Sequence, residues 1–492
     1  MSNKVRVRFC PSPTGDPHVG MVRTALFNWA FAKHHNGTFV FRIEDTDAAR
    51  DSEESYKALL DSMRWLGLNW DEGPEVGGPF GPYRQSERMD IYKDVAKKLH
   101  EKGFAYHCYC TQDEVEERRK AQKEKGQTPG YDAHCRELTE NQVSDFKALG
   151  REPVLRFRMP SKTITWNDLV RGELSFEHEH IPDYVLVRAN GDPLYTLVNP
   201  TDDALMEITH VLRGEDLLSS TPRQIALYEA FKQIGVGQGT TPEFGHLPYV
   251  MGEGNKKLSK RDPESSLLMY RREGFLPEGL LNYLALLGWS FGDDIEFFSM
   301  KEMADNFEIS RVSANPARFD IKKCTAINAD WIRKLSVSEL ANRMEKQLIE
   351  VGVLPNSPSK EQKDLLLAAT PLVQERLETL SQVPGMLSFL FVEEKDFVVD
   401  HEDAEKSLTH DILPALEASV KIIKELPEFK TEKLHDELNR VLVTEMGLKA
   451  RIVFTALRVA VTGRRVSPPL FESMEIMGRE KVIARIEKHL KK

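Results

Sequence analysis

The first 45 residues carry the pattern that most constrains the fold. Residues 4–9 alternate basic and apolar side chains, which predicts a strand, and the loop-forming sequence PSPTGDPHVG follows. Apolar residues then recur with helical spacing from Val22 to Ala30, and a second strand is expected over 38–43. Strand, helix and strand in this order form a βαβ unit, which predicts a parallel sheet that binds ligands at the carboxyl ends of its strands.

The rest of the chain changes character twice. Residues 113–125 are dense in charge and predict a solvated helix, and residues 153–200 are strand-like, including PLYTLV at 193–198. Beyond about residue 330 the periodicity is helical almost throughout. The sequence therefore predicts an α/β front half interrupted by an inserted module, followed by an α-helical back half.

Composition describes an ordinary soluble chain with an acidic balance. The 492 residues predict about three or four domains. The net charge of -10 alone argues against a nucleic-acid partner. The distribution argues otherwise, because residues 449–492 hold 11 bases and 4 acids. We expect no membrane segment and a cytoplasmic location, since the chain shows neither a signal peptide nor a long apolar run.

Two stretches have the chemistry of phosphate binding. The loop PSPTGDPHVG holds Gly15 and Gly20 and delivers His18 to a helix N-terminus, where anions are favoured. The stretch Lys256–Arg261, KKLSKR, brings four cations and a hydroxyl after a glycine-containing stretch. Each alone has an ordinary explanation, namely a tight turn with a surface histidine and a solvated basic loop.

Together these stretches resemble the two signatures of class I aminoacyl-tRNA synthetases. The segments FRIEDTD at 41–47, GPYRQSER at 81–88, THVLRGEDLLSSTPRQ at 209–224 and KLSKR at 257–261 resemble the bacterial glutamyl-tRNA synthetase family more narrowly. The resemblance covers the first 330 residues or so, and the last 160 match only in length and helical character. One departure is Met21, which stands where the signature has its final histidine.

The resemblance implies a fold and a division of the chain. It implies an α/β Rossmann-type catalytic domain with an inserted α+β acceptor-binding module, followed by an all-α anticodon-binding region. The expected segments are the two catalytic halves at 1–107 and 195–250, the insertion at 108–194, a connecting domain at 251–330 and the anticodon-binding domain at 331–492.

The resemblance also implies a reaction in two steps. ATP with Mg²⁺ and L-glutamate would form glutamyl-adenylate, and the glutamyl group would then pass to the 3′-terminal adenosine of tRNA(Glu). The family usually requires bound tRNA for the first step. Whether tRNA(Gln) is also charged stays open, and a monomer is expected.

Site residues follow by matching the family's motifs. The implied catalytic residues are His18, Lys257 and Lys260, and the implied ATP-binding residues are Thr14, Gly15, His18, Gly20, Lys257, Ser259 and Lys260. The implied glutamate-binding residues are Arg8, Ser12, Glu44, Tyr195, Asn199 and Arg213. Two arginines and one acid suit a dicarboxylate with one ammonium group: Arg213 for the α-carboxylate, Arg8 for the side chain and Glu44 for the ammonium.

Five cysteines are too few and too uneven for a disulfide framework. Cys10 is expected to be a small buried residue. Cys108, Cys110 and Cys135, with Tyr131, fall where some relatives hold structural zinc. Here Arg136 and Glu137 follow Cys135, so a fourth ligand from a Cys-x-His pair is missing, and zinc and a metal-free cluster both stay open.

The helical back half contains one candidate site residue. Arg376 matches an arginine that contacts the third anticodon base in the family, and a helix-surface charge is its ordinary alternative.

Three alternative functions are disfavoured. The helical back half disfavours a glutaminyl enzyme, and the presence of that half disfavours a queuosine-modifying paralogue. A catalytically dead RNA-binding relative is disfavoured by the intact His18 and Lys260.

Overall fold

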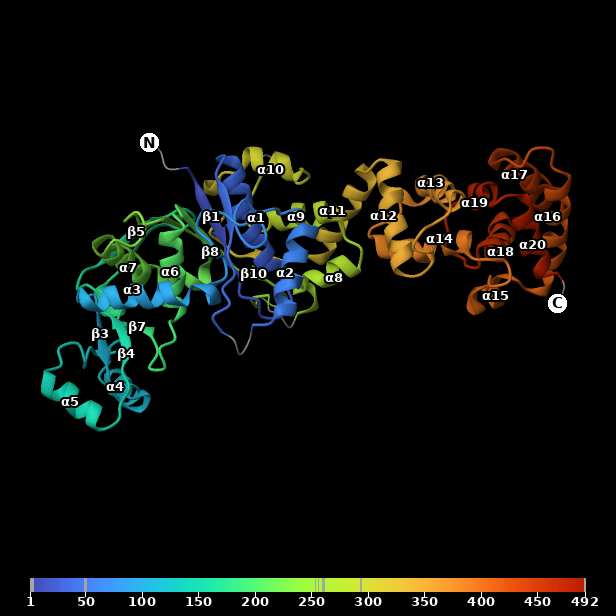
Figure 1. Cartoon of the computed structure of the whole chain (residues 1–492). Helices are drawn as coiled ribbons and strands as arrows, with labels where there is room; N and C mark the ends of the chain where they lie inside the picture. The colour runs from blue at the N-terminus through green and yellow to red at the C-terminus, as the bar shows by residue number, and fades with distance from the viewer. Residues whose placement is uncertain are drawn as a thin grey trace. The chain divides into compact units, whose positions relative to one another are not determined.

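The computed structural model describes residues 4–47, 51–252, 254, 256–258, 262–292 and 294–490. The chain divides into two compact units (Figure 1). The first comprises residues 1–269 and 281–321, and the second comprises residues 270–280 and 322–492.

The first unit begins with the predicted βαβ element. Strand β1 (Arg6–Phe9) leads through the proline-rich loop into helix α1 (Val19–His34), and β2 (Thr38–Phe41) returns parallel to β1. The register runs from Arg6 opposite Thr38 to Phe9 opposite Phe41. This confirms the prediction of a parallel sheet.

A second parallel pair lies beside the first. Strand β8 (His210–Gly214), helix α7 (Thr221–Ile234) and β9 (Glu243–Leu247) repeat the pattern, and β8 is parallel to β9. The amide of Thr209 donates to the carbonyl of Arg6, which joins the start of β8 to β1. Two halves separated by about 170 residues of sequence therefore build one nucleotide-binding-type core.

The insertion between these halves is an antiparallel module. Its three-stranded sheet has the order β3-β4-β7, formed by β3 (Ala105–Cys108), β4 (Val154–Phe157) and β7 (Tyr184–Val187). A hairpin of β5 (Ile164–Asp168) and β6 (Gly172–Phe176) follows β4. No residue of helices α4 (Gln112–Glu124) and α5 (Glu140–Ala148) is buried, which confirms the solvated helix expected near 113–125.

One predicted strand is a helix. PLYTLV was expected to be extended, but α6 (Tyr195–Leu205) begins inside it and buries its residues from Leu197 to Asp203. Local β-propensity is overridden here by tertiary contacts. Asp202 and Asp203 both receive buried arginines, and a strand would point them to opposite faces.

The remaining elements of the first unit surround this core. They are α2 (Glu53–Trp65), α3 (Met89–Glu101), α10 (Met300–Asn306) and the short parallel pair of β10 (Val250–Met251) and β11 (Ala317–Arg318). The chain passes between the units within α8 (Leu267–Arg272) and α9 (Pro277–Leu286) and at the start of α11 (Ile321–Lys334).

The second unit is helical, as the sequence predicts. No strand occurs in residues 322–490, all of which are described. After α11, its α-helices are α12 (Val337–Glu350), α13 (Lys360–Gln374), α14 (Val383–Phe391), α15 (His401–Ser407), α16 (Leu413–Glu425), α17 (Thr431–Leu438), α18 (Ala450–Thr462), α19 (Leu470–Met477) and α20 (Arg479–Lys488). Two apolar cores hold them, one around Leu340 and Leu366 and one around Leu416 and Leu457. Within the described ranges, no helix is long and apolar enough to cross a membrane.

Candidate active site

A cavity of about 580 Å³ opens at the carboxyl ends of β1, β8 and β9. This is the edge at which a parallel sheet of this kind binds its ligands. The cavity brings together seven residues that the sequence singled out: Arg8, His18, Gly20, Glu44, Tyr195, Arg213 and Lys257. Met21, which replaces the signature's final histidine, also lies in its wall.

Arg8, in the cavity wall, belongs to a buried set of paired charged groups. Arg8 donates from Nε to both carboxylate oxygens of Asp203 at 3.2 Å, and Arg42 donates from Nη1 to Asp203 Oδ1 at 2.8 Å. Burial alone would disfavour the ionised carboxyl, but the two arginines hold the pKa of Asp203 below its ordinary value. Arg8 is therefore charged and fixed in place before any substrate arrives.

Glu44 stands beside this pair and is held from two sides. Arg42 Nη2 lies 3.3 Å and Asn199 Nδ2 lies 2.5 Å from Glu44 Oε1. Burial raises the pKa of Glu44, and Arg42 opposes the rise. Asn199 lies behind the cavity wall and reaches it through Glu44, and its buried Oδ1 has no hydrogen-bond partner among the described residues.

A third arginine completes the buried network. Arg88 donates from Nε to Asp202 Oδ1 at 2.7 Å, and Tyr92 and Gln85 donate to the other oxygen of Asp202. Three arginines (Arg8, Arg42 and Arg88) thus face three carboxylates (Glu44, Asp202 and Asp203). Arg42, Arg88, Asp202 and Asp203 were not predicted as site residues from the sequence. The available signal was the pair of adjacent acidic residues within the apolar sequence of α6.

Arg213 faces the same cavity from β8. Its Nη2 donates to Thr221 Oγ1 at 2.8 Å and its Nε to His246 Nε2 at 3.1 Å. Its buried Nη1 has no protein partner within the described part of the chain. Tyr195 lies in the wall, and burial raises the pKa of its hydroxyl.

His18 and Gly20 also line this cavity. His18 is the N-cap of α1, and its Nδ1 accepts the amide of Met21 at 3.2 Å, which places the proton of the neutral ring on Nε2. A Cβ at Gly20 would lie 3.3 Å from His18 Nδ1, so a side chain there would crowd the ring. Ser12, Thr14 and Gly15 line a smaller cavity of about 190 Å³ that also borders His18.

Lys257 brings positive charge to the same region. Its Nζ lies 3.6 Å from Asp216 Oδ2 and 4.2 Å from the centre of the Tyr249 ring. Ser259 and Lys260 lie outside the described residues. Part of the cavity wall is apolar, which was not predicted from the sequence. The apolar lining residues are Leu212, Leu217, Leu247, Pro248 and Val250.

Cys10 differs from its expected place in the core. It is half-buried in the cavity wall, where burial raises the pKa of its thiol to about 12. It is therefore an uncharged lining residue next to Arg8.

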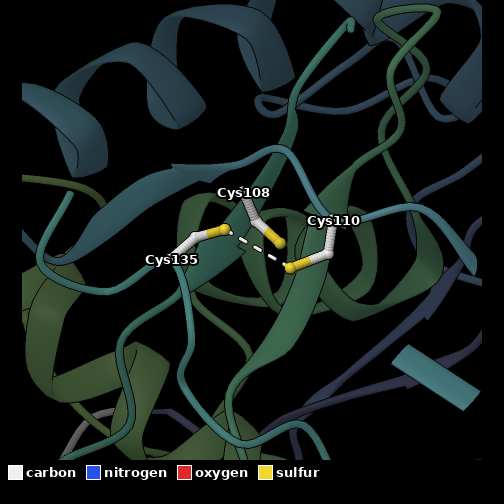
Figure 2. A group of neighbouring side chains, drawn as sticks. All are labelled: Cys108, Cys110 and Cys135. Atoms are coloured by element: carbon white, nitrogen blue, oxygen red, sulfur yellow. Dashed lines mark hydrogen bonds between the residues drawn. The ribbon is translucent and has the colours of Figure 1, made fainter. Parts of the chain in front are cut away.

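The three clustered cysteines converge in the insertion, with their sulfur atoms turned toward one another (Figure 2). All three sulfurs lie within 4.8 Å of one another, and Cys110 and Cys135 are 3.4 Å apart. Cys108 Sγ donates to the Tyr131 hydroxyl oxygen at 3.2 Å, and that oxygen lies 3.8 Å from Cys110 Sγ. The four side chains named from the sequence therefore form one cluster.

Arginines surround this cluster. Arg118 Nη2 lies 2.9 Å from Cys110 Sγ, and the guanidinium of Arg156 lies 3.7 Å from the centre of the Tyr131 ring. Hydrogen bonds from Cys110 and Cys135 lower the pKa of Cys108. The surroundings favour a thiolate at Cys108, the form that binds metal, whereas the neighbouring Cys108 and Cys135 raise the pKa of Cys110.

In the second unit, basic residues gather around the segment after α18. Arg376 Nη1 donates to the carbonyl of Ser467 at 3.1 Å, and Arg458 Nη1 donates to Ser467 Oγ at 2.7 Å. A groove of about 660 Å³ lies nearby, lined by Gln382, Gly385, Met386, Asp403, Arg451, Thr455, Arg464, Arg465 and Val466. Arg376 thus holds the backbone of the segment that borders this groove.

Family models match both units. Residues 4–326 match the catalytic domain of tRNA synthetases class I (E and Q), and residues 339–490 match an anticodon binding domain. The fold and the cavity thus define a class I aminoacyl-tRNA synthetase.

Comparison with similar proteins identifies the family within this class. The chain is 59% identical over 486 residues to the glutamate–tRNA ligase of Nocardioides sp., covering 99% of this chain and 98% of that one. It is 60% identical to that of Saccharopolyspora erythraea, covering 98% and 95%. A crystal structure of a glutamate tRNA ligase from Elizabethkingia meningosepticum in complex with its amino acid superposes with a TM-score of 0.84 at 33% identity, covering 99% of each chain. The chain belongs to the glutamate–tRNA ligase family.

Proposed function

We propose that this protein ligates glutamate to tRNA and that the cavity at the ends of β1, β8 and β9 is where the chemistry occurs. One observation carries the proposal. Two arginines and one carboxylate, Arg8, Arg213 and Glu44, line a single cavity together with His18 and Lys257. That set of charges matches glutamate at one end and a phosphate chain at the other.

The first step joins the two substrates. An oxygen of the glutamate α-carboxylate attacks the α-phosphorus of ATP, and pyrophosphate leaves. Arg213 orients the attacking carboxylate, and His18 donates from Nε2 to the phosphate oxygens as charge develops on them. Lys257, with Lys260 beyond the described residues, stabilises the leaving pyrophosphate.

The second step transfers the glutamyl group. A ribose hydroxyl of the terminal adenosine of tRNA attacks the activated carbonyl carbon and releases its proton, and AMP leaves with the electron pair of the broken C–O bond. Mg²⁺ bound to ATP would supply positive charge to the phosphates in the first step.

The buried network explains how glutamate is chosen over glutamine. Arg8, Arg42 and Arg88 balance Glu44, Asp202 and Asp203 in charge. The α-carboxylate that both amino acids carry is neutralised by Arg213. Glutamate adds one further carboxylate and one ammonium group, which keeps the balance of the other charges. Glutamine adds only the ammonium group besides its α-carboxylate, so one buried positive charge is left in excess, which is costly.

ATP–pyrophosphate exchange tests the assignment. We expect exchange that requires glutamate and, as in the family, bound tRNA. Arg213→Ala should raise the KM for glutamate about 100-fold, since a buried carboxylate–arginine contact contributes about 3 kcal/mol. Unchanged glutamate kinetics in this variant would remove the role given to Arg213.

We propose further that Cys108, Cys110, Cys135 and Tyr131 hold a structural zinc ion. The donor set fits, because three thiolates and one oxygen donor complete a tetrahedral site. Arg118 beside Cys110 and Arg156 over the Tyr131 ring offset the excess negative charge of such a site. Protein purified without chelator should contain about one equivalent of zinc by elemental analysis, and clearly less than one equivalent would contradict the site.

The basic groove of the second unit is proposed as the anticodon contact, with Arg376 beside it. The acceptor end of tRNA is assigned to the insertion.

Charging assays on tRNA(Glu) and tRNA(Gln) decide whether tRNA(Gln) is also a substrate. The monomeric, cytoplasmic state stays a prediction, which sedimentation of the purified protein and fractionation of cells check.

A further inference from the structure

A buried aspartate–histidine pair lies directly behind Arg213. Asp168 ends β5 in the hairpin of the insertion, and His246 lies on β9 of the catalytic core. Both side chains are fully buried, and His246 Nδ1 lies 2.5 Å from Asp168 Oδ2. Neither residue lines the cavity, and none of the roles assigned above uses them.

Hydrogen bonds determine which nitrogen of His246 carries the proton. Asp168 Oδ1 accepts the backbone amides of Val170, Arg171 and His246, each at 3.1 Å, which fixes the carboxylate. The carboxylate accepts only, so Nδ1 of His246 is the protonated nitrogen and Nε2 is the acceptor. Burial also lowers the pKa of His246, which keeps the ring neutral.

The acceptor nitrogen of His246 faces the arginine of the cavity. Arg213 Nε donates to it at 3.1 Å, and Thr221 Oγ1, which accepts Arg213 Nη2, lies 3.0 Å from it. Nε and Nη2 of Arg213 are thereby occupied on the side away from the cavity. The buried Nη1 has no partner in the described part of the protein.

We propose that Asp168 and His246 are positioning residues that orient Arg213 toward the α-carboxylate of glutamate. This rests on the proposed function, which makes Arg213 the ligand of that carboxylate. A fixed tautomer turns the guanidinium so that its remaining donor serves the substrate, as supporting hydrogen bonds do for other binding groups. The pair also ties the hairpin of the insertion to the amino-acid site.

Asp168→Asn tests the tautomer. The asparagine oxygen takes the place of Oδ1, because three backbone amides donate there, so its NH₂ group faces His246 Nδ1. The ring proton then moves to Nε2, where it meets the donor Nε of Arg213. We expect the KM for glutamate to rise about tenfold while the KM for ATP changes less than about twofold.

Two substitutions of His246 by an amide side chain test its two ring nitrogens separately. The glutamine amide reaches the position of Nε2 and can offer its oxygen to Arg213, whereas the asparagine amide reaches only the position of Nδ1. His246→Gln should therefore keep the KM for glutamate within about threefold of the wild type, and His246→Asn should raise it about tenfold. Equal effects of the two variants would overturn the proposal, and this pair serves even if Asp168→Asn does not fold.

His210→Gln is the matched control. His210 lies on β8 at the other end of the same strand pair, with Nε2 3.5 Å from Glu243. We expect it to leave the KM for glutamate unchanged. Thermal unfolding of every variant separates lost orientation from lost folding.

A double-mutant cycle separates the positioning role of His246 from the glutamate-binding role of Arg213. If His246 acts through Arg213, His246→Asn should add little to the effect of Arg213→Ala. An effect of Arg213→Ala with none from Asp168→Asn or His246→Asn would overturn the positioning role and leave the proposed function standing. No effect of Arg213→Ala on glutamate would contradict the proposed function itself.

Discussion

The arginines of the catalytic cavity and those of the basic groove in the second unit differ in their burial and in their partners. At the cavity, Arg8 in the wall and Arg42 behind it are almost fully buried and pair with Asp203. In the second unit, Arg376 and Arg458 donate to the backbone and side chain of Ser467, and Arg464 and Arg465 line an open groove. The first arrangement suits reading one charge on a small substrate, and the second suits contact with a solvated phosphate backbone.

This difference predicts how substitutions in the two regions should behave. Removing a buried charge from the cavity should cause a large and substrate-specific loss, because its partners stay buried. Removing a groove arginine should cause a small loss that depends on salt, since exposed contacts are screened.

The largest effect is expected from Arg8→Gln. The substitution removes the charge that would meet the glutamate side chain, while Arg42 still pairs with Asp203. We expect the KM for glutamate to rise at least about 100-fold, equivalent to about 3 kcal/mol, with the KM for ATP nearly unchanged. Arg6→Gln, two residues away on β1 and paired with Glu72, is the control and should leave the KM for glutamate unaltered.

Arg485→Met tests a buried charge that lies in the other unit. Arg485 is fully buried on α20, where it contacts Glu394 and the carbonyls of Val461 and Phe389. Its loss leaves two buried carbonyls unsatisfied, so the free energy of unfolding should fall by about 2–3 kcal/mol. Glutamate kinetics with saturating tRNA should stay unchanged. A specific loss of glutamate affinity would break the distinction between the units.

Removal of zinc should have an intermediate and local effect. A strong chelator takes away the metal that would join Cys108 and Cys110 to Cys135, and structural zinc contributes to folding. We expect a lower melting temperature and weaker tRNA binding, both restored by added zinc. Cys324→Ser, at a buried cysteine outside the cluster, is the control for general thiol effects.

The smallest effect is expected from the groove. Arg464→Ala and Arg465→Ala should each weaken tRNA binding by about 1 kcal/mol and lower the slope of log Kd against log salt by about one. Arg440→Ala removes an exposed arginine that pairs with Glu437 and should leave the slope unchanged. An unaltered slope in the groove variants would mean that these arginines do not contact phosphates.

Much of this account could be read from the sequence because it rests on local patterns. The βαβ unit at 4–43 predicted the sheet and the edge at which the cavity lies. The resemblance to a family predicted that Arg8, Glu44, Tyr195 and Arg213 meet, and the structure brings all four to one cavity. Ser12 and Asn199 lie outside the wall of that cavity.

The parts that escaped prediction depend on contacts between distant residues. Arg8 and Asp203 are 195 positions apart, and Asp168 and His246 are 78 apart. No periodicity encodes such pairs. Helix α6 was not predicted for a related reason. The β-propensity of its sequence is outweighed by the contacts that the buried Asp202 and Asp203 make with arginines from other elements.

The central claim is that a balanced set of buried charges selects glutamate. The most direct measurement compares kcat/KM for glutamate and glutamine in ATP–pyrophosphate exchange with saturating tRNA(Glu). The account predicts a preference for glutamate of about 10⁴-fold or more, because glutamine leaves a buried cation unpaired. A preference below about tenfold would contradict it.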